Sequence, residues 1–341
     1  MLRHGGNLRQ AAEQYGIPLE QWLDLSTGIN PNGWPVPPIS SACWLHLPQD
    51  DDGLEAAARQ YYQASQVLPV AGSQAAIQCL PLLRPCGTVG MLSPAYAEHA
   101  YSWSRYGHTV VNVTEEDIAS RLTELDVLLL VHPNNPTGQT YSAEQLLDWH
   151  HKLGEQGGWL VVDEAFMDTI PDQSLAPFTD RPGLIVLRSL GKFFGLAGAR
   201  CGFVLAESLL LDRLRELLGP WTLSGPSREV ARRALNDVAW QETTRKSLLG
   251  QGKRLQQLLN CYSLKADGGT SLFQWLQHPQ ALTIHTALAK QGIWIRYFEH
   301  PQSLRFGLPA TEAQWQVLQQ ALQQLMNDLI RREEMDETLV L

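Results

Sequence analysis

The chain alternates between short apolar runs and longer segments in which apolar residues recur at helical spacing. The helical patterns include Glu55–Ala64, Gln74–Leu83 and Ala143–Gln156. The apolar, β-branched runs lie at Val67–Val70, Thr88–Leu92, Thr109–Val113, Val127–Val131, Leu160–Val162, Leu184–Leu187 and Gly202–Leu205. Strands that alternate with helices predict an α/β domain whose sheet is mostly parallel and covered on both faces. The strands are apolar throughout, which is typical of a buried parallel sheet.

The pattern changes after this region. Leu209–Leu218 has the spacing of an amphipathic helix and is stopped by Gly219-Pro220, and helical spacing continues from Ser227 to Leu259. The remaining residues mix short strands with a final helix, Glu312–Arg331. We therefore predict a large domain over residues 41–225 and a smaller α+β domain over residues 226–341.

The first 40 residues form a third region. Asn7–Gln14 has helical spacing, whereas the prolines within Asn30–Pro38 remove backbone donors and exclude regular structure there. We predict an irregular N-terminal arm with one short helix.

Composition and charge exclude several classes of function. The 341 residues carry a net charge of −9 and contain no basic run, which argues against a nucleic-acid-binding protein. No apolar stretch reaches the roughly 18 residues of a membrane span, and no secretory signal is visible. The five cysteines are scattered without a CxxC pair, so we expect reduced thiols in the cytoplasm and no metal site. They are Cys43, Cys79, Cys86, Cys201 and Cys261.

The stretch Ser189–Arg200 carries the strongest sign of chemistry. It places Lys192 after an apolar strand and Arg200 eight residues later. A lysine amine can bind the aldehyde of a cofactor covalently, and an arginine can hold a phosphate on the same cofactor.

Three other segments follow predicted strands in the same domain. Gly72 lies in a turn between a strand and a helix, where free N–H groups attract anions. Asn135 lies in the loop His132–Gly138 at a strand end, where ligands of α/β sheets bind. Asp163 ends an apolar strand, where an unpaired charge would be unfavourable, and a protonated pyridine nitrogen could pair with it.

With these motifs in this order, the chain resembles the fold type I pyridoxal-phosphate enzymes of the class I/II aminotransferase superfamily. It is most similar to the branch of histidinol-phosphate aminotransferases and threonine-phosphate decarboxylases. The resemblance extends over nearly the whole chain, and its specific parts are the NNPTG sequence at 134–138 and the spacing from Lys192 to Arg200. It implies a large domain with a seven-stranded sheet and pyridoxal 5'-phosphate as cofactor.

The resemblance also implies roles for individual residues. Lys192, Asp163 and Tyr96 are the expected catalytic residues: Lys192 holds the cofactor aldehyde and moves protons, Asp163 pairs with the pyridine nitrogen, and Tyr96 stacks on the ring. Asn135 is expected to donate to the ring 3-oxygen. The cofactor phosphate is expected to contact Gly72, Ser73, Gln74, Ser189 and Arg200.

Two arginines and the N-terminal arm are expected to bind the substrate. Arg296 and Arg305 match the arginines that grip a carboxylate or phosphate in this branch, a task that suits the planar guanidinium. The sequences His4-Gly5-Gly6-Asn7 and Leu23–Gly33 resemble the start of the decarboxylases of cobalamin biosynthesis. By this resemblance the arm packs with the smaller domain, and His4, Asn7 and Asn30 close over the substrate phosphate.

Three positions depart from the family pattern. Phe166 stands where a tyrosine is frequent, which removes a hydroxyl donor to the ring oxygen. Gly191 replaces a serine or threonine before the lysine, which removes a phosphate contact. Leu47-Pro48 stands where a tyrosine commonly reaches into the partner's site. Weaker cofactor binding or altered ring electronics would follow, but Lys192 and Asp163 are intact.

The resemblance implies decarboxylation of a phosphorylated amino acid, L-threonine O-3-phosphate, to (R)-1-aminopropan-2-yl phosphate by a homodimer. Two alternatives stay open at this point. An aminotransferase of the histidinol-phosphate type would use nearly the same residues, and the arm motif favours the decarboxylase. A cofactor-binding regulator or structural partner would not need the intact lysine and aspartate.

Overall fold

The computed structural model describes the backbone of residues 5–339 and the side chains as far as residue 328. Its contacts divide the chain into two compact units, which we call the large unit, Gly33–Arg245, and the small unit, Met1–Asn32 with Lys246–Leu341. The predicted boundaries lie elsewhere, after residues 40 and 225. The difference arises because helix α9, Gly225–Asn236, packs against α3, Leu54–Tyr62, of the large unit.

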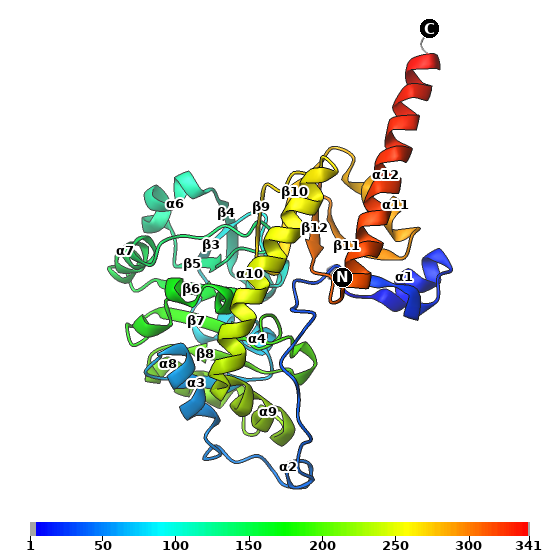
Figure 1. Cartoon of the computed structure of the whole chain (residues 1–341). Helices are drawn as coiled ribbons and strands as arrows, with labels where there is room; N and C mark the ends of the chain where they lie inside the picture. Colours follow the sequence, from blue (N-terminus) through cyan, green and yellow to red (C-terminus); the bar gives the residue numbers. More distant parts are fainter. Residues whose placement is uncertain (1–4, 340–341) are drawn as a thin grey trace. The chain divides into compact units, whose positions relative to one another are not determined.

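The large unit is built on a seven-stranded sheet (Figure 1) with the strand order β2-β8-β7-β6-β5-β3-β4. Pairing is parallel from β7 through β4, and β8 runs opposite to its neighbours β2 and β7. This confirms the predicted mostly parallel sheet. The strands are β2 (Leu68–Val70), β3 (Thr88–Leu92), β4 (Thr109–Val113), β5 (Val127–Val131), β6 (Trp159–Asp163), β7 (Leu184–Ser189) and β8 (Gly202–Leu205).

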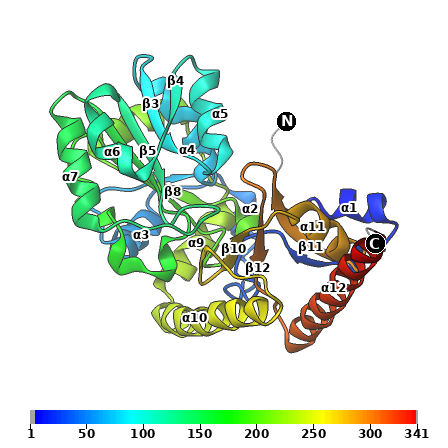
Figure 2. The same cartoon turned by 90° about the horizontal axis from the view of Figure 1, so that it is seen from above.

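Helices cover both faces of this sheet (Figure 2). On one face, apolar side chains of α4 (Ser73–Cys79), α5 (Ala97–Arg105) and α8 (Ser208–Leu218) pack in one buried cluster with alternate residues of the strands. On the other face, α7 (Ala143–Gly154) packs on β6, and the ring of Tyr62 in α3 lies 5.5 Å from that of Phe203 in β8. Both faces of the strands are therefore buried, which explains their continuous apolar character. The short helices α2 (Ala42–Leu45) and α6 (Glu115–Arg121) complete the unit.

The long helical stretch predicted from Ser227 to Leu259 is two helices. α9 ends at Asn236, and α10 runs from Val238 to Cys261. The break lies at Asp237, whose carboxylate accepts the backbone N–H of Trp240 and the indole N–H of Trp34. A carboxylate that caps the first turn of a helix ends the preceding helix at the same point.

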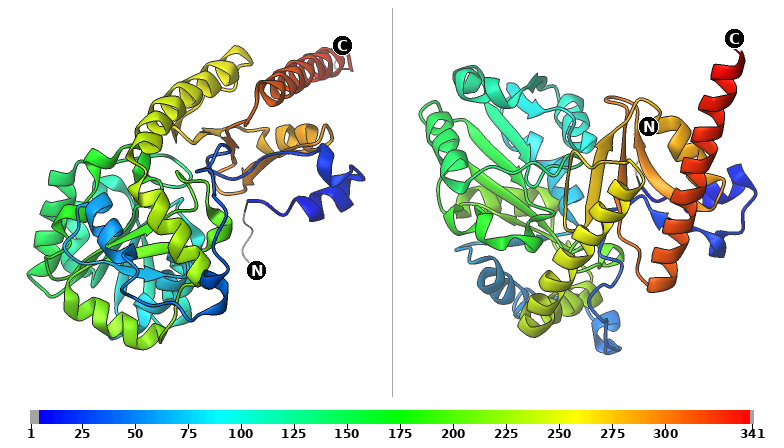
Figure 3. Two further views of the ribbon diagram at one scale, coloured as in Figure 1. Left: turned by 60° about the horizontal axis from the view of Figure 1, so that its bottom comes forward. Right: turned by 45° about the horizontal axis from the view of Figure 1, so that its top comes forward.

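The small unit contains a five-stranded sheet with the order β1-β11-β12-β10-β9. β1 pairs with β11 in parallel, and the other strands are antiparallel. Helix α12, which is predicted to end at Arg331, extends to Leu339, as the red helix in Figure 3 shows. The elements are α1 (Leu8–Tyr15), β1 (Leu23–Leu25), β9 (Gly268–Thr270), β10 (Phe273–Gln277), α11 (Ala281–Ala289), β11 (Ile293–Phe298), β12 (Ser303–Gly307) and α12 (Glu312–Leu339).

The N-terminal arm is more regular than predicted. Besides the expected short helix α1, it contributes strand β1, in which Leu23 and Leu25 are buried and Asp24 is half-buried. Burying the two leucines and completing the backbone hydrogen bonds of β11 are what make this segment a strand. Within the described part of the chain, no helix has the length and apolar character needed to cross a membrane.

Candidate active site

The predicted cofactor residues gather at one edge of the large sheet. The strands β2, β3, β5, β6 and β7 point the same way, so their carboxyl ends lie at a common edge, and β8 starts there because it runs in the opposite direction. This is the edge at which open α/β sheets bind ligands. The residues in or following these strand ends, or preceding the start of β8, are Gly72, Ser73, Gln74, Tyr96, Asn135, Asp163, Ser189, Lys192 and Arg200.

Gly72 and Arg200, two of the residues predicted to contact the cofactor phosphate, lie close together at this edge. Gly72 has a φ of 72°, and a Cβ atom built on it would lie 2.6 Å from Nη2 of Arg200. The left-handed backbone at this position favours glycine, and the Arg200 guanidinium lies close to it. Ser73 begins α4 directly after Gly72, so the start of this short helix and a positive charge lie near each other.

Asp163 has a partner that the sequence did not reveal. Nε2 of His99, in α5, lies 2.8 Å from Oδ2 of Asp163, and the backbone N–H of Ala165 donates to Oδ1 at 3.0 Å. Both side chains are buried, with exposed fractions of 1% and 4%. A histidine on the buried face of an amphipathic helix is usually a packing residue, so its position in the sequence gave no sign of this contact.

The loop that carries Lys192 is anchored by the two aromatic residues after it. Phe193 and Phe194 are fully buried, and both rings pack against Trp240, at 5.3 and 5.5 Å between centroids. Nζ of Lys192 lies 5.5 Å from the centre of the Phe166 ring. Phe166, which stands where a tyrosine is frequent in the family, therefore lies next to the lysine amine.

Gly191, the second departure, lies in a closely packed turn. A Cβ atom at this position would lie 3.3 Å from Oγ of Ser189 and 3.4 Å from Cα of Ala197. The backbone N–H of Gly191 donates to the same Ser189 oxygen at 3.2 Å. The Cβ contact with Ser189 is tight and the one with Ala197 is ordinary van der Waals contact, so a side chain at this position would press on the Ser189 hydroxyl.

The loop of Asn135 is closed by a buried histidine. Nε2 of His132 lies 3.0 Å from the backbone nitrogen and 3.1 Å from the carbonyl oxygen of Tyr141, which joins the two ends of the loop. Burial lowers the pKa of His132 to about 4, so the ring is neutral at pH 7. Within the loop, Asn134 donates to Pro94 O at 3.0 Å and to Thr137 Oγ1 at 2.8 Å. Asn135 itself is half-buried.

Tyr96 lies close to the charged groups of this edge. Its hydroxyl donates to Oε1 of Gln74 at 3.4 Å, and Gln74 donates to Glu98 at 2.8 Å. Burial, with smaller effects of Asp163 and Glu98, raises the pKa of Tyr96 to about 12, so its hydroxyl is neutral at pH 7.

The small unit holds a pair of arginines. Arg296 in β11 and Arg305 in β12 are directly opposite each other in the antiparallel register. Arg305 is buried; it donates to Ser26 O at 2.8 Å and lies over the ring of Phe273. Burial and the charge of Arg296 lower the pKa of Arg305, and Asp24 opposes them. Two guanidinium groups at opposite positions of neighbouring strands make this pair a candidate site for binding an anion.

The arm is fixed beside Arg305 by its glycines. A Cβ atom on Gly5 would lie 2.5 Å from Ser26 O, the oxygen that accepts from Arg305. Gly6 N donates to Ser26 Oγ, and Gly6 O accepts from the Trp294 indole. The close approach of Gly5 to Ser26 and the backbone hydrogen bonds of Gly6 therefore give both glycines of the arm motif a structural role.

The three arm residues predicted to bind substrate lie in different settings. Asn7 is exposed with a left-handed backbone at the start of α1, and Asn30 is buried with its Oδ1 accepting from Asn32 N at 2.9 Å. His4 lies outside the described residues.

Comparisons identify relatives of the chain. Residues 45–322 match the family of aminotransferase class I and II. The chain is 55% identical to the threonine-phosphate decarboxylase of Pseudomonas aeruginosa, over 94% of this chain and 97% of that protein. It is 29% identical to the histidinol-phosphate aminotransferase of Shewanella oneidensis, over 70% and 65%. The structure of the histidinol-phosphate aminotransferase of Sinorhizobium meliloti in complex with pyridoxal-5'-phosphate aligns at a TM-score of 0.81 and 20% identity, covering 96% of both chains. The chain therefore belongs to the aminotransferase class I and II family.

Proposed function

We propose that the chain is a pyridoxal-phosphate-dependent lyase that converts L-threonine O-3-phosphate to (R)-1-aminopropan-2-yl phosphate and CO2 in cobalamin biosynthesis. The observation that carries this proposal is the 55% identity, over nearly the full length, to a threonine-phosphate decarboxylase. The sequence identity to the histidinol-phosphate aminotransferase is 29%, about half of this value, which favours the lyase over the aminotransferase reaction.

The residues at the edge of the large sheet fit the cofactor. The Arg200 guanidinium lies close to Gly72, directly before the start of α4, so a positive charge is present where we propose that the cofactor phosphate binds. A buried carboxylate and a lysine amine are the other two groups that the cofactor needs. When bound, pyridoxal phosphate supplies an aldehyde for the substrate amine and an electron-accepting ring.

We assign the chemical steps to residues of the large unit. Lys192 holds the cofactor and returns a proton to the substrate Cα after CO2 leaves. Asp163, oriented by His99, holds the proton of the ring nitrogen. Arg200, with Gly72, Ser73, Gln74 and Ser189, binds the cofactor phosphate; Tyr96 stacks on the ring, and Asn135 donates to its 3-oxygen.

We assign substrate binding to the small unit. Arg305 and Arg296 bind the anionic ends of L-threonine O-3-phosphate, and so set which bond of Cα is aligned for cleavage. His4, Asn7 and Asn30 of the arm contact the phosphate. The opposite positions of Arg296 and Arg305 on neighbouring strands support this assignment, because both guanidinium groups can donate to one anionic ligand.

We further propose that the chain acts as a homodimer in the cytoplasm. Trp44 and Leu45 in α2 and Leu47 after it expose 68%, 77% and 65% of their surface. Such a continuous apolar segment is typical of a surface that a second subunit covers. The free cysteines are consistent with a reducing compartment.

The substrate choice is tested by comparing two phosphorylated amines. Purified protein with pyridoxal phosphate is given L-histidinol phosphate and 2-oxoglutarate, and formation of glutamate is followed. We expect no sustained glutamate formation, while L-threonine O-3-phosphate is consumed without any 2-oxo acid. Many turnovers with L-histidinol phosphate would instead favour the aminotransferase.

A further inference from the structure

A buried group of charged side chains lies beside the proposed cofactor residues and has no role in the chemistry above. Arg188, Glu164 and Asp168 have side chains that are at most 2% exposed. Nη1 of Arg188 lies 2.6 Å from Oε2 of Glu164, and Nη2 is paired with Oδ1 of Asp168. We call these three residues the buried triad. Because it is enclosed by protein, it does not touch a ligand.

The triad joins the two strands that carry the proposed chemistry. β6 and β7 pair in parallel with Asp163 opposite Leu187, and Glu164 N donates to Leu187 O at 2.9 Å. Glu164 follows Asp163 at the end of β6, and Arg188 follows Leu187 in β7. Since successive side chains alternate between faces, they point away from the face that holds Asp163. The triad therefore connects the end of β6 to the end of β7, which leads directly into Lys192.

A second set of contacts extends from the triad to the lysine loop. The hydroxyl of Tyr61 donates to Oδ1 of Asp168 at 3.0 Å, and its ring lies 5.6 Å from that of Phe194. Arg245 donates to the same hydroxyl at 3.0 Å and lies 5.3 Å over the ring of Phe193. Phe193 and Phe194 are the two residues that follow the lysine.

Stability does not account for this arrangement. An enclosed ion pair loses about as much free energy of hydration as it gains in attraction, and well-packed apolar residues are often equally stable. Such a pair does fix geometry, because the guanidinium fork binds two carboxylates in defined directions.

We propose that Arg188 is a positioning residue that sets the place of Lys192 relative to Asp163 by holding Glu164 and Asp168 on one guanidinium. The inference rests on the proposed function, in which Lys192 and Asp163 bind the cofactor. It predicts that cofactor binding depends on the ability of the Arg188 guanidinium to donate to both carboxylates, and that a positive charge alone at this position is not enough.

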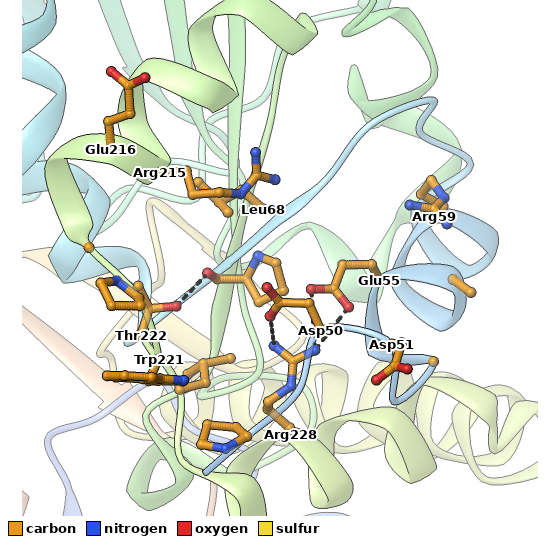
Figure 4. Close-up of a pocket in the computed structure, with 17 residues that line it drawn as sticks. Asp50, Asp51, Glu55, Arg59, Leu68, Arg215, Glu216, Trp221, Thr222 and Arg228 are labelled. Carbon is orange, nitrogen blue, oxygen red and sulfur yellow. Dashed lines mark hydrogen bonds and ion pairs between the residues drawn. The ribbon is translucent and has the colours of Figure 1, made fainter.

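Arg228 provides a matched control in the same unit. Its side chain is 4% exposed, and it donates to Asp52 at 2.7 and 2.8 Å and to Glu55 at 3.0 Å. It lines a surface pocket of about 770 Å³, where Figure 4 shows it beside Glu55. None of the residues proposed to bind the cofactor lines that pocket.

The experiment compares Arg188→Lys with Arg228→Lys in the full chain. Lysine keeps the charge of each arginine but cannot donate to two carboxylates in the same way. The measurements are the midpoint of thermal unfolding without cofactor, the dissociation constant of pyridoxal phosphate, and the pH at which the visible absorption of the loaded protein changes. We expect both variants to lose thermal stability, and R188K alone to bind the cofactor about tenfold more weakly and to shift the pH midpoint.

Two results would overturn the inference. R188K could lose stability like R228K while keeping the wild-type dissociation constant and pH midpoint. If R188K does not fold, Asp168→Asn takes its place, because it removes one charge with little change of shape; wild-type cofactor binding by a folded D168N would also contradict the role. A wild-type protein that does not bind pyridoxal phosphate would instead contradict the proposed function itself.

Discussion

Single positions in the arm and in β12 lie at the proposed substrate-binding site. Ser26 O accepts from Arg305, and Gly5 approaches the same oxygen so closely that a Cβ atom would lie 2.5 Å away. No flexible side chain can move aside there, because the neighbour is backbone. The arm and the arginine are therefore positioned together.

Gly5→Ala tests this coupling. The new methyl group displaces Ser26 O and with it Arg305, so we expect the KM for L-threonine O-3-phosphate to rise about tenfold, with a smaller change of kcat. Gly250→Ala is the control, since a Cβ at this helical position meets nothing within 4 Å. An unchanged KM in G5A would contradict the role of the arm.

Arg305→Met separates function from stability. Methionine fills much of the space of the arginine side chain and removes the cost of burying its charge, so we expect the free energy of unfolding to change by no more than about 1 kcal/mol. The KM for the phosphorylated substrate is expected to rise about a hundredfold. Steady-state kinetics measure the KM of the variant, and urea unfolding measures its free energy of unfolding.

Arg254→Met serves as the control for R305M in the same unit, since Arg254 pairs with Glu312 at an exposed site. Its KM is expected to stay at the wild-type value. If R305M lost several kcal/mol of stability and kept its KM, Arg305 would be a structural residue.

Among the elements, the predicted strands of the large sheet agree with the structure within one or two residues. Buried parallel strands consist of apolar residues on both faces, so their ends are marked by the first polar residue or glycine. β1 was missed because Leu23–Leu25 is a three-residue segment with a central aspartate, too short for a periodic signal. The break at Asp237 was missed because helical spacing continues on both sides.

The site could be predicted as far as its motifs extend. Lys192, Asp163 and Arg200 lie in strand-end segments with recognisable spacing, and the structure places them at one edge of the sheet. His99 and the buried triad could not be found, because their contacts depend on helix packing and on the register of β6 and β7. The chemical roles of these residues stay predictions.

The loop over residues 132–141 gives the fold a predicted dependence on pH. The folded pKa of His132 is about 4 and lies below the ordinary value of 6.5. The unfolded chain therefore binds more protons between these values, so stability is fully present above pH 6.5 and is lost as pH falls toward 4. The loss from this group is on the order of 3 kcal/mol.

Urea unfolding at a series of pH values checks this, with His132→Gln as the comparison. The variant lacks the titrating ring, so we expect its stability to fall less steeply between pH 6.5 and pH 4. The free energy of unfolding still falls with decreasing pH in both proteins, because burial also lowers the pKa of His285 to about 4. Identical slopes in the two proteins would contradict the assignment.

For the whole molecule, the exposed segment around α2 predicts association of two subunits. Trp44→Glu places a charge in this segment, and burying it in an interface would be unfavourable. We expect wild type to sediment as a dimer and W44E as a monomer at micromolar concentration. Leu209→Glu, at a residue 69% exposed on α8, is the control and stays dimeric. If the wild-type protein sedimented as a monomer, the proposed dimer would be wrong.

The central claim is that the protein removes CO2 from L-threonine O-3-phosphate with pyridoxal phosphate. The most direct measurement incubates purified protein with both compounds and no 2-oxo acid, and follows the products by mass spectrometry. The account predicts (R)-1-aminopropan-2-yl phosphate over many turnovers, and none with Lys192→Ala. Conversion of the cofactor to its amine form, with no decarboxylated product, would contradict the claim and indicate an aminotransferase.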